Sequence, residues 1–265
     1  MNVRIILSGL LIAATLSACS TETVQSNQVP SLQNNNVKNQ EKSEIPDLFT
    51  NVMEELKKNP VPVVLPKTLP PVLNPREYNA VKVKTSTDGY EITIYSTSES
   101  GNKDGGITME AMKATFSGRI VSNYHPGEDY VEGMKEKLKY SKAIVIDRTP
   151  MTYYSVETNP IGVGGDLVVW HDGNWLLATQ GNPNDIGQSL DQAPEYTSIG
   201  LARELLKLMK PIEGKEIKRG FILGQEAPKR TLKLEWTYDD RIWYSIDSFN
   251  WNYVFAAMNS LVKLK

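Results

Sequence analysis

The chain has 265 residues, of which 40% are hydrophobic and 23% charged, a composition typical of a globular protein rather than a disordered one. Its 29 basic and 31 acidic residues give a formal net charge of −2, so the sequence offers no electrostatic attraction to nucleic acid or to anionic lipid headgroups. Cys19 is the only cysteine, which excludes an intramolecular disulfide and leaves the fold to be stabilised by its own core.

Residues 1–18 have the pattern of a secretory signal. A basic residue, Arg4, precedes an apolar run that begins at Ile5, and small residues follow that run at Ser17 and Ala18. The run is shorter than the roughly 20 residues that a helix needs to span a bilayer. The sequence therefore predicts that the protein is exported and that residues 1–18 are removed as a signal peptide.

The tetrapeptide Leu16-Ser17-Ala18-Cys19 closely resembles the lipobox of bacterial lipoproteins. The resemblance implies that diacylglycerol is attached to Cys19, that the chain is cut before this residue, and that the new amino terminus is acylated. Two acyl chains give stable anchoring, whereas one is marginal. We therefore expect a lipid-anchored protein on the extracytoplasmic face of the cell membrane. An ordinary cleaved signal that leaves Cys19 free is the alternative.

A flexible tether is predicted after the anchor, so that residues 19–44 comprise the lipidated cysteine and a polar linker. Residues 20–44 are rich in Asn, Gln and Ser and contain no aromatic residue, so they cannot bury enough apolar surface to offset the entropy of ordering. A flexible chain of this length typically reaches roughly 25–30 Å. The sequence thus predicts a domain held away from the bilayer.

Residues 45–75 are predicted to form a short helix and a proline-rich connector. Leu48, Val52 and Leu56 recur on one helical face after Pro46, and six prolines follow between residues 60 and 75. Such a run favours extended backbone, as a stiff connector or, alternatively, as a docking site for an aromatic groove. The globular region is expected to cover residues 76–265.

Alternating apolar residues predict mostly strands in the globular region. A tight-turn pair, Asp88-Gly89, predicts the first hairpin. The further expected elements, in chain order, are a strand at 113–121, a helix at 129–140, strands at 143–146 and 151–156, a hairpin at 167–179, a helix at 196–209, strands at 217–223, 232–236 and 241–246, and a helix at 251–262.

Two segments of the chain follow the same plan. In each segment, an apolar strand ends in a tryptophan, Trp170 or Trp236, and an acidic turn follows. A second strand then begins at or near a second tryptophan, Trp175 or Trp243, and a helix comes after it. A helix after a hairpin can cover the apolar face of that hairpin. We predict an α+β fold with a curved antiparallel sheet and helices packed on one face, built from two similar hairpin–helix units.

Residues 232–261 loosely resemble a C-terminal domain of unknown function found in Gram-positive surface lipoproteins and anti-sigma-type proteins. The shared features are a strand ending at Trp236, a turn at Asp239-Asp240, a tyrosine strand at Tyr244 and a helix closing near Ser260-Leu261. Residues 64–70 resemble the Leu-Pro motif that opens such domains. Some of these lipoproteins resemble periplasmic carriers whose curved sheet cups an apolar ligand, so the resemblance implies a fold but no functional residue.

The sequence offers no catalytic constellation. The two histidines, His125 and His171, have no partner at metal-ligand spacing, and neither HExxH nor G-x-S-x-G occurs. We therefore predict no catalytic residue, no metal and no cofactor. Trp170, Trp175, Trp236 and Trp243 are either core residues or the lining of a groove for peptide, glycan or acyl chain.

These observations predict a non-catalytic binding lipoprotein whose protein or small-molecule ligand the sequence does not name. Two alternatives stay open. The first is a carrier or chaperone that holds an apolar ligand in a cavity between the sheet and its helices. The second is an envelope enzyme that uses dispersed carboxylates, which would need two acids in one concave pocket.

Overall fold

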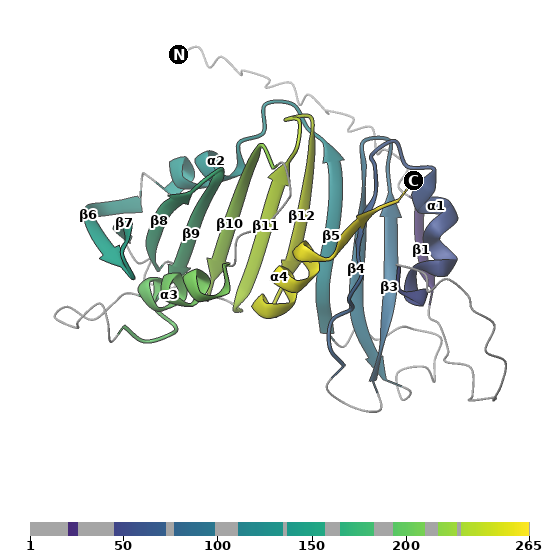
Figure 1. Cartoon of the computed structure of the whole chain (residues 1–265), viewed down its shortest axis with the longest axis horizontal. Coiled ribbons are helices and arrows are strands. Elements are labelled where there is room, and N and C mark those ends of the chain that lie inside the picture. Colours follow the sequence, from purple (N-terminus) through teal and green to yellow (C-terminus); the bar gives the residue numbers. More distant parts are fainter. Residues whose placement is uncertain are drawn as a thin grey trace, which may run out of the picture.

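The computed structural model describes residues 21–25, 45–72, 77–98, 111–134, 137–156, 165–182, 193–209, 217–226 and 229–264. These residues form an α+β fold built on one large twisted sheet (Figure 1). The strands are β1 (Thr21–Gln25), β2 (Val64–Pro66), β3 (Glu77–Thr85), β4 (Gly89–Ser98), β5 (Ala111–Ile120), β6 (Leu138–Ile146), β7 (Thr149–Val156), β8 (Asp166–Asp172), β9 (Trp175–Gly181), β10 (Arg219–Gln225), β11 (Thr231–Thr237), β12 (Ile242–Ser248) and β13 (Leu261–Lys263). The helices are the 3-10 helix η1 (Asp47–Val52) and the α-helices α1 (Met53–Lys57), α2 (Pro126–Met134), α3 (Ser198–Leu208) and α4 (Trp251–Asn259).

Eleven strands form the main sheet in the order β1-β3-β4-β5-β12-β11-β10-β9-β8-β7-β6. Neighbouring strands in it are antiparallel except β9 and β10, which are parallel and joined by a crossover through α3. Parallel neighbours require such a crossover because a tight turn cannot connect them. Strands β2 and β13 pair separately. The predicted curved antiparallel sheet is therefore confirmed, with one parallel pair, β9 and β10, in its interior.

One face of the sheet carries the main core. The helices α1, α3 and α4 pack there, and α3 and α4 follow the hairpins β8–β9 and β11–β12 as the repeated plan predicted. Side chains without exposed surface from this face and its helices are Ile92, Ile94, Leu177, Ile222, Leu234, Trp236, Ile246, Phe49, Leu56, Leu205, Val254 and Met258. Each fully buried aliphatic side chain contributes roughly 1.5–3 kcal/mol of transfer free energy.

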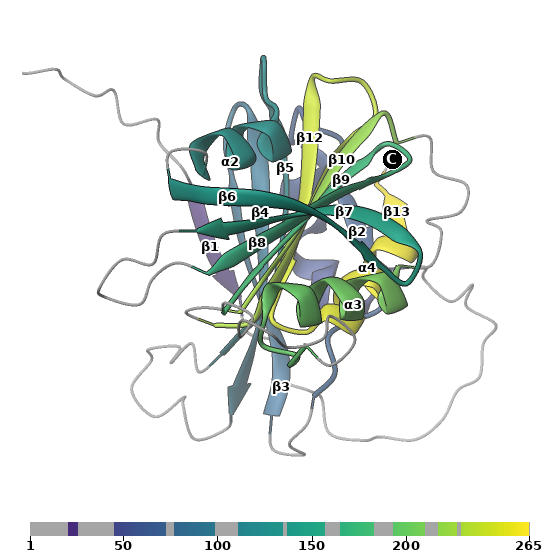
Figure 2. The ribbon, with the colours of Figure 1, turned by 90° about the vertical axis from the view of Figure 1, so that its left-hand side faces the viewer.

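Helix α2 lies against the opposite face, which the prediction of helices on one face did not include (Figure 2). It packs on the alternate side chains of β9 and β10, so Leu176 and Phe221 contact α2 while Leu177 and Ile222 face the main core. Successive residues of a strand point to opposite faces, which is why one apolar run can serve both layers. The β9–β10 region is therefore covered on both sides.

The predicted boundaries before residue 76 do not separate structural units. Within the predicted tether, Thr21–Gln25 form β1 and pair with β3 along the edge of the sheet, while residues 26–44 lie outside the described part. The predicted proline-rich connector contributes β2, and Leu65 is fully buried in the main core. This segment packs against the domain through the buried apolar residues that lie between its prolines.

The helix predicted over 129–140 is α2, which begins at Pro126 and ends at Met134. Proline suits the first helical turn because its missing N–H has no intrahelical partner there. Residues 138–140 belong instead to β6, which pairs with β7 through a turn at Asp147 and Arg148, both with positive φ. That turn was not predicted because neither residue is a glycine, the usual occupant of such positions.

Two glycines allow aromatic rings to lie directly on the sheet. A methyl group added at Gly118 would lie 2.5 Å from the Tyr90 ring, and one added at Gly220 would lie 2.2 Å from the ring of Trp175. Contacts this short cannot be accommodated without moving a buried ring, because protein cores are closely packed. The two aromatic side chains therefore depend on the missing β-carbons of their neighbours.

We expect Gly220→Ala to lower the free energy of unfolding by about 1–3 kcal/mol, the usual cost of overpacking a core. Gly133→Ala is the matched control, because an added methyl group there meets no atom within 4 Å on an exposed turn of α2. The control should be unchanged or more stable by up to about 1 kcal/mol, since alanine favours the helix. Urea unfolding of both variants tests this, and equal stabilities would contradict it.

Candidate functional site

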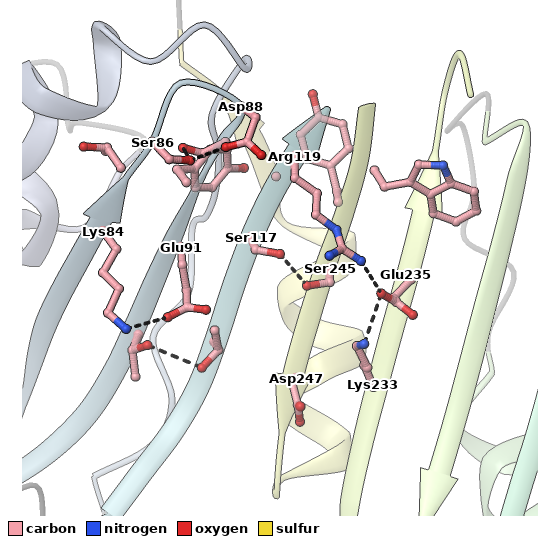
Figure 3. Close-up of a pocket in the computed structure, with 18 of the residues that line it drawn as sticks. Lys84, Ser86, Asp88, Glu91, Ser117, Arg119, Lys233, Glu235, Ser245 and Asp247 are labelled. Carbon is pink, nitrogen blue, oxygen red and sulfur yellow. Dashed lines mark hydrogen bonds and ion pairs between the residues drawn. The ribbon is translucent and has the colours of Figure 1, made fainter. Parts of the chain in front are cut away.

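None of the described helices covers the face opposite the main core over β4, β5, β12 and β11, where a cavity of about 620 Å³ lies on the sheet (Figure 3). We call it the polar trough. The side chains labelled there are Lys84, Ser86, Asp88, Glu91, Ser117, Arg119, Lys233, Glu235, Ser245 and Asp247. They alternate along their strands with core residues, so the burial of one face fixes what the other face presents.

Hydroxyl groups form the floor of the trough. The Oγ atoms of Ser117 and Ser245 lie 2.7 Å apart across β5 and β12, and the Oγ1 atoms of Thr93 and Thr115 lie 3.5 Å apart across β4 and β5. A hydroxyl can both donate and accept a hydrogen bond. The floor can therefore bind polar groups of either kind.

Glu235 is the most buried charged residue in the trough, with 5% of its surface exposed. The Tyr124 hydroxyl donates a hydrogen bond of 2.8 Å to its Oε1, the Lys233 ammonium lies 3.0 Å from it, and the Arg119 guanidinium lies 3.9 Å from it. Such partners offset the cost of removing a carboxylate from water. Glu235 thus anchors three side chains in fixed positions beside the floor.

The segment after β5 contacts three of the residues that line the trough, Arg119, Glu235 and Trp243. Asn123, with a φ of 54°, turns the chain so that the Tyr124 ring meets Trp243 edge to face at 5.2 Å, while the Arg119 guanidinium lies 4.6 Å from the Tyr124 ring. Burial and the Glu235 carboxylate raise the pKa of Tyr124 to about 12, against the effect of Arg119. The phenol therefore stays protonated and donates to Glu235 at neutral pH.

Asp247 lies in the trough without a comparable set of partners. Asp247 on β12 pairs with Lys233 on β11, two residues before Glu235 on the same strand. Its Oδ1 is buried and has no hydrogen-bond partner among the described residues. Burial raises the pKa of the Asp247 carboxyl; the Lys233 ammonium acts against this, and the Glu235 carboxylate adds to it. Asp247 is therefore the less well compensated of the two buried or half-buried carboxylates Glu235 and Asp247 in the trough.

A second cavity, of about 720 Å³, lies between α2 and the strands β6, β7 and β8. Its lining is largely apolar and includes Val131, Ala143, Tyr154 and Leu176. Glu128 of α2 contributes a carboxylate to this lining. We call this cavity the apolar groove, and it lies on the same sheet face as the polar trough.

A smaller cavity of about 190 Å³ lies at the start of α2. Arg219 lines it, donates from Nε to Asp240 at 2.9 Å and places its Nη1 2.6 Å from Nδ1 of His125. Hydrogen bonding to Lys218 is the main cause that holds the pKa of Asp240 below its usual range. Positive groups in this cavity are thus already paired with a carboxylate.

The structure does not bring the four predicted tryptophans into one groove. Trp175 and Trp236 are core residues, packed against Gly220 and Tyr244 respectively. Trp243 borders the polar trough and Trp170 borders the apolar groove, although both are buried. Two of the four therefore contribute to cavities, at different places on the sheet. The predicted cleavage and lipidation residues, Leu16, Ser17, Ala18 and Cys19, lie outside the described residues.

Sequence reasoning missed the polar residues of the trough. The signal was present: Lys233 and Glu235 alternate with core residues on β11, as Ser245 and Asp247 do on β12. Such alternation also occurs on any solvated sheet face. Only the register between strands that are far apart in the sequence shows that these positions converge.

Neither a metal centre nor a membrane span is apparent in the described part of the chain. No group of three or more His, Cys, Asp or Glu side chains there could hold a metal ion. None of the helices described has the length and hydropathy needed to cross a bilayer.

Comparison with known protein families, with curated proteins and with solved structures finds no match. The resemblance of residues 232–261 to the domain of Gram-positive lipoproteins therefore stays a prediction.

We expect Asp247→Asn to stabilise the protein at pH 7. A raised pKa means that the fold favours the neutral acid, so the ionised carboxylate destabilises the native state at neutral pH and ceases to do so as the pH falls through its pKa. The stability difference between variant and wild type should therefore shrink toward zero below about pH 4, the ordinary range of aspartate. Urea unfolding at a series of pH values measures it.

Asp239→Asn is the control, and it should lower the free energy of unfolding at pH 7, whereas Asp247→Asn should raise it. Partial burial acts to raise the pKa of Asp239, but the N–H groups of Arg241 and Ile242 and the Arg241 side chain lower it overall. Its ionised form therefore stabilises the fold at neutral pH, and that contribution is lost as the pH falls. A destabilising effect of Asp247→Asn at pH 7, or the same pH profile for both variants, would contradict the assignment.

Proposed function

We propose that the protein is a lipid-anchored, extracytoplasmic binding protein with a non-catalytic role, and that its ligand-binding surface is the polar trough. The observation that carries the binding role is an open cavity of about 620 Å³ with a hydroxyl floor between charged side chains. The lipobox resemblance at Leu16–Cys19 supports the anchor and the location.

The chemistry of the trough favours a polar ligand that carries both charges. The Asp247 carboxylate, which lines the trough, can accept a hydrogen bond from an ammonium or amide group, and the exposed Lys84 and Arg119 side chains can meet a carboxylate. A peptide presents all of these groups on an extended backbone. We therefore favour a peptide over a glycan, because no exposed tryptophan ring lines the trough for a sugar to stack on.

The packing of the main core favours this role over that of an apolar-ligand carrier. A carrier of the kind considered needs a cavity between the sheet and its helices. In the described residues, the space under α1, α3 and α4 holds side chains with no exposed surface, among them Trp236, Val254 and Met258, so the apolar groove beside α2 is where a carrier of this kind would have to hold its ligand. The polar trough lies on the other face, and its hydroxyl and charged groups would be left without partners by an apolar ligand.

Labelling with radioactive palmitate tests the anchor. We expect the wild-type chain, expressed in a bacterial host, to incorporate label and to fractionate with membranes, and Cys19→Ala to lose both properties. Cys19→Ala removes the only thiol in the chain, so label that persists in this variant would be attached elsewhere and would contradict the proposal.

Ser117→Arg tests the trough, because an arginine on the floor fills the space between β4 and β12. Peptides selected from a random phage-displayed library on the wild-type protein should bind this variant at least about tenfold more weakly, a loss of about 1.4 kcal/mol. Ser141→Arg is the matched control on an exposed position of β6. Failure to select any peptide, or equal binding to both variants, would speak against a peptide ligand in the trough.

A further inference from the structure

The first described strand begins two residues after the predicted lipidation site. Thr21 pairs with Thr85, and the pairing continues to Gln25 with Val81. Because β1 and β3 are antiparallel, Thr21 lies at the end of the sheet where β3 finishes (Figure 1). The start of β1 therefore fixes which end of the sheet is nearest to Cys19 along the chain.

Chain length limits how far Cys19 can lie from this end. Only Ser20 lies between Cys19 and Thr21, and each of the two residue steps spans at most about 3.6 Å, so the two α-carbons are within about 7 Å of each other. A fully flexible linker over residues 20–44 would instead reach roughly 25–30 Å. Pairing of β1 thus shortens the connection between anchor and domain by several-fold.

One row of paired residues extends this end across the sheet. Thr85 pairs with Tyr90, Tyr90 with Gly118, Gly118 with Tyr244, and Tyr244 with Trp236. The segments beyond this row are residues 86–88, 121–125 and 238–241, which lie together at the upper end of the sheet in Figure 1. We call these segments, with the strand ends that they join, the anchor end.

Two large apolar side chains are exposed at the anchor end, Ile120 at 47% and Tyr238 at 41%. They belong to neighbouring parts of the sheet, because Ile120 pairs with Ile242 and Tyr238 contacts Tyr244 at 5.8 Å between ring centroids. Tyrosine is enriched where proteins meet the membrane interface, since its ring is apolar and its hydroxyl is polar. The anchor end thus offers side chains suited to the headgroup region.

We propose that the anchor end rests on the bilayer surface, with the strands upright and the polar trough opening next to the lipid headgroups. This inference rests on the proposed lipid anchor. Thr85, Ser86 and Asp88 line the trough at the anchor end, so this end of the trough is held close to the membrane. A ligand must then be reachable at the bilayer surface rather than deep in the surrounding envelope.

Charge does not drive this docking. Basic residues at the anchor end and at the neighbouring start of β10 are paired with acidic ones: Arg241 lies 3.2 Å from Asp239, and Lys218 and Arg219 both pair with Asp240. The orientation comes from the short covalent connection and from the exposed apolar side chains. It should therefore be the same on neutral and on anionic bilayers.

Fluorescence quenching of the full, lipidated chain in vesicles tests the orientation. Since Cys19 carries the lipid, a single added cysteine can be labelled selectively, at Thr87→Cys in the anchor end or at Lys229→Cys beyond the start of β11. These two exposed positions differ by about 20 Å along the strands. Vesicles of phosphatidylcholine, with and without phosphatidylglycerol, carry a nitroxide quencher on the lipid headgroup.

The label at Thr87→Cys should lose most of its fluorescence in both kinds of vesicle, and the label at Lys229→Cys should lose little. Adding Thr23→Pro and Val24→Pro removes two backbone N–H groups from β1. This double substitution should restore the Thr87→Cys signal while the circular dichroism spectrum stays unchanged. Equal quenching at the two positions in vesicle-bound protein would overturn the orientation but not the anchor. Failure of the protein to sediment with vesicles would overturn the anchor and this inference with it.

Discussion

Burial of one face of the sheet under α1, α3 and α4 is the constraint on which the rest of the structure depends. Strand side chains alternate between faces, so each residue committed to the core, such as Ile92, Leu234 or Ile246, sends its neighbours to the other side. Those neighbours are hydroxyl and charged residues over β4, β5, β12 and β11. The trough is thus the consequence of how the core is packed.

The two ends of the opposite face differ in chemistry because α2 covers only part of it. Over β9 and β10, α2 buries Leu176 and Phe221 in a second, smaller core. Beyond α2, no other described helix covers this face, which carries polar side chains, and Glu235 has three partners there, Tyr124, Arg119 and Lys233. Burial with compensation rigidifies Glu235, whereas Asp247 keeps an oxygen without a partner. The two carboxylates of the trough therefore differ in how well their charge is compensated.

The edge of the sheet links the domain to its predicted anchor. An edge strand exposes backbone groups that readily pair with another segment, and β3 receives β1 from the same chain. The pairing converts part of a polar, linker-like sequence into a strand without requiring an apolar face. Composition describes what a segment can bury, but it does not exclude backbone pairing along an available edge.

The sequence by itself determined the α+β class, the hairpins around residues 88, 173 and 239, and the helices after the second and third of them, because alternation, turn residues and helical periodicity are local properties. It also supplied the prediction of export and lipidation, which depends on a contiguous motif. Only the tertiary structure decided that α2 packs on the second face, that Leu65 belongs to the core, and that Trp175 and Trp236 are core residues. The pairing of β5 with β12 brings Ser117 next to Ser245, residues 128 positions apart. Strand order and register arise from the packing of the whole chain, so no local pattern could have placed the residues of the trough together.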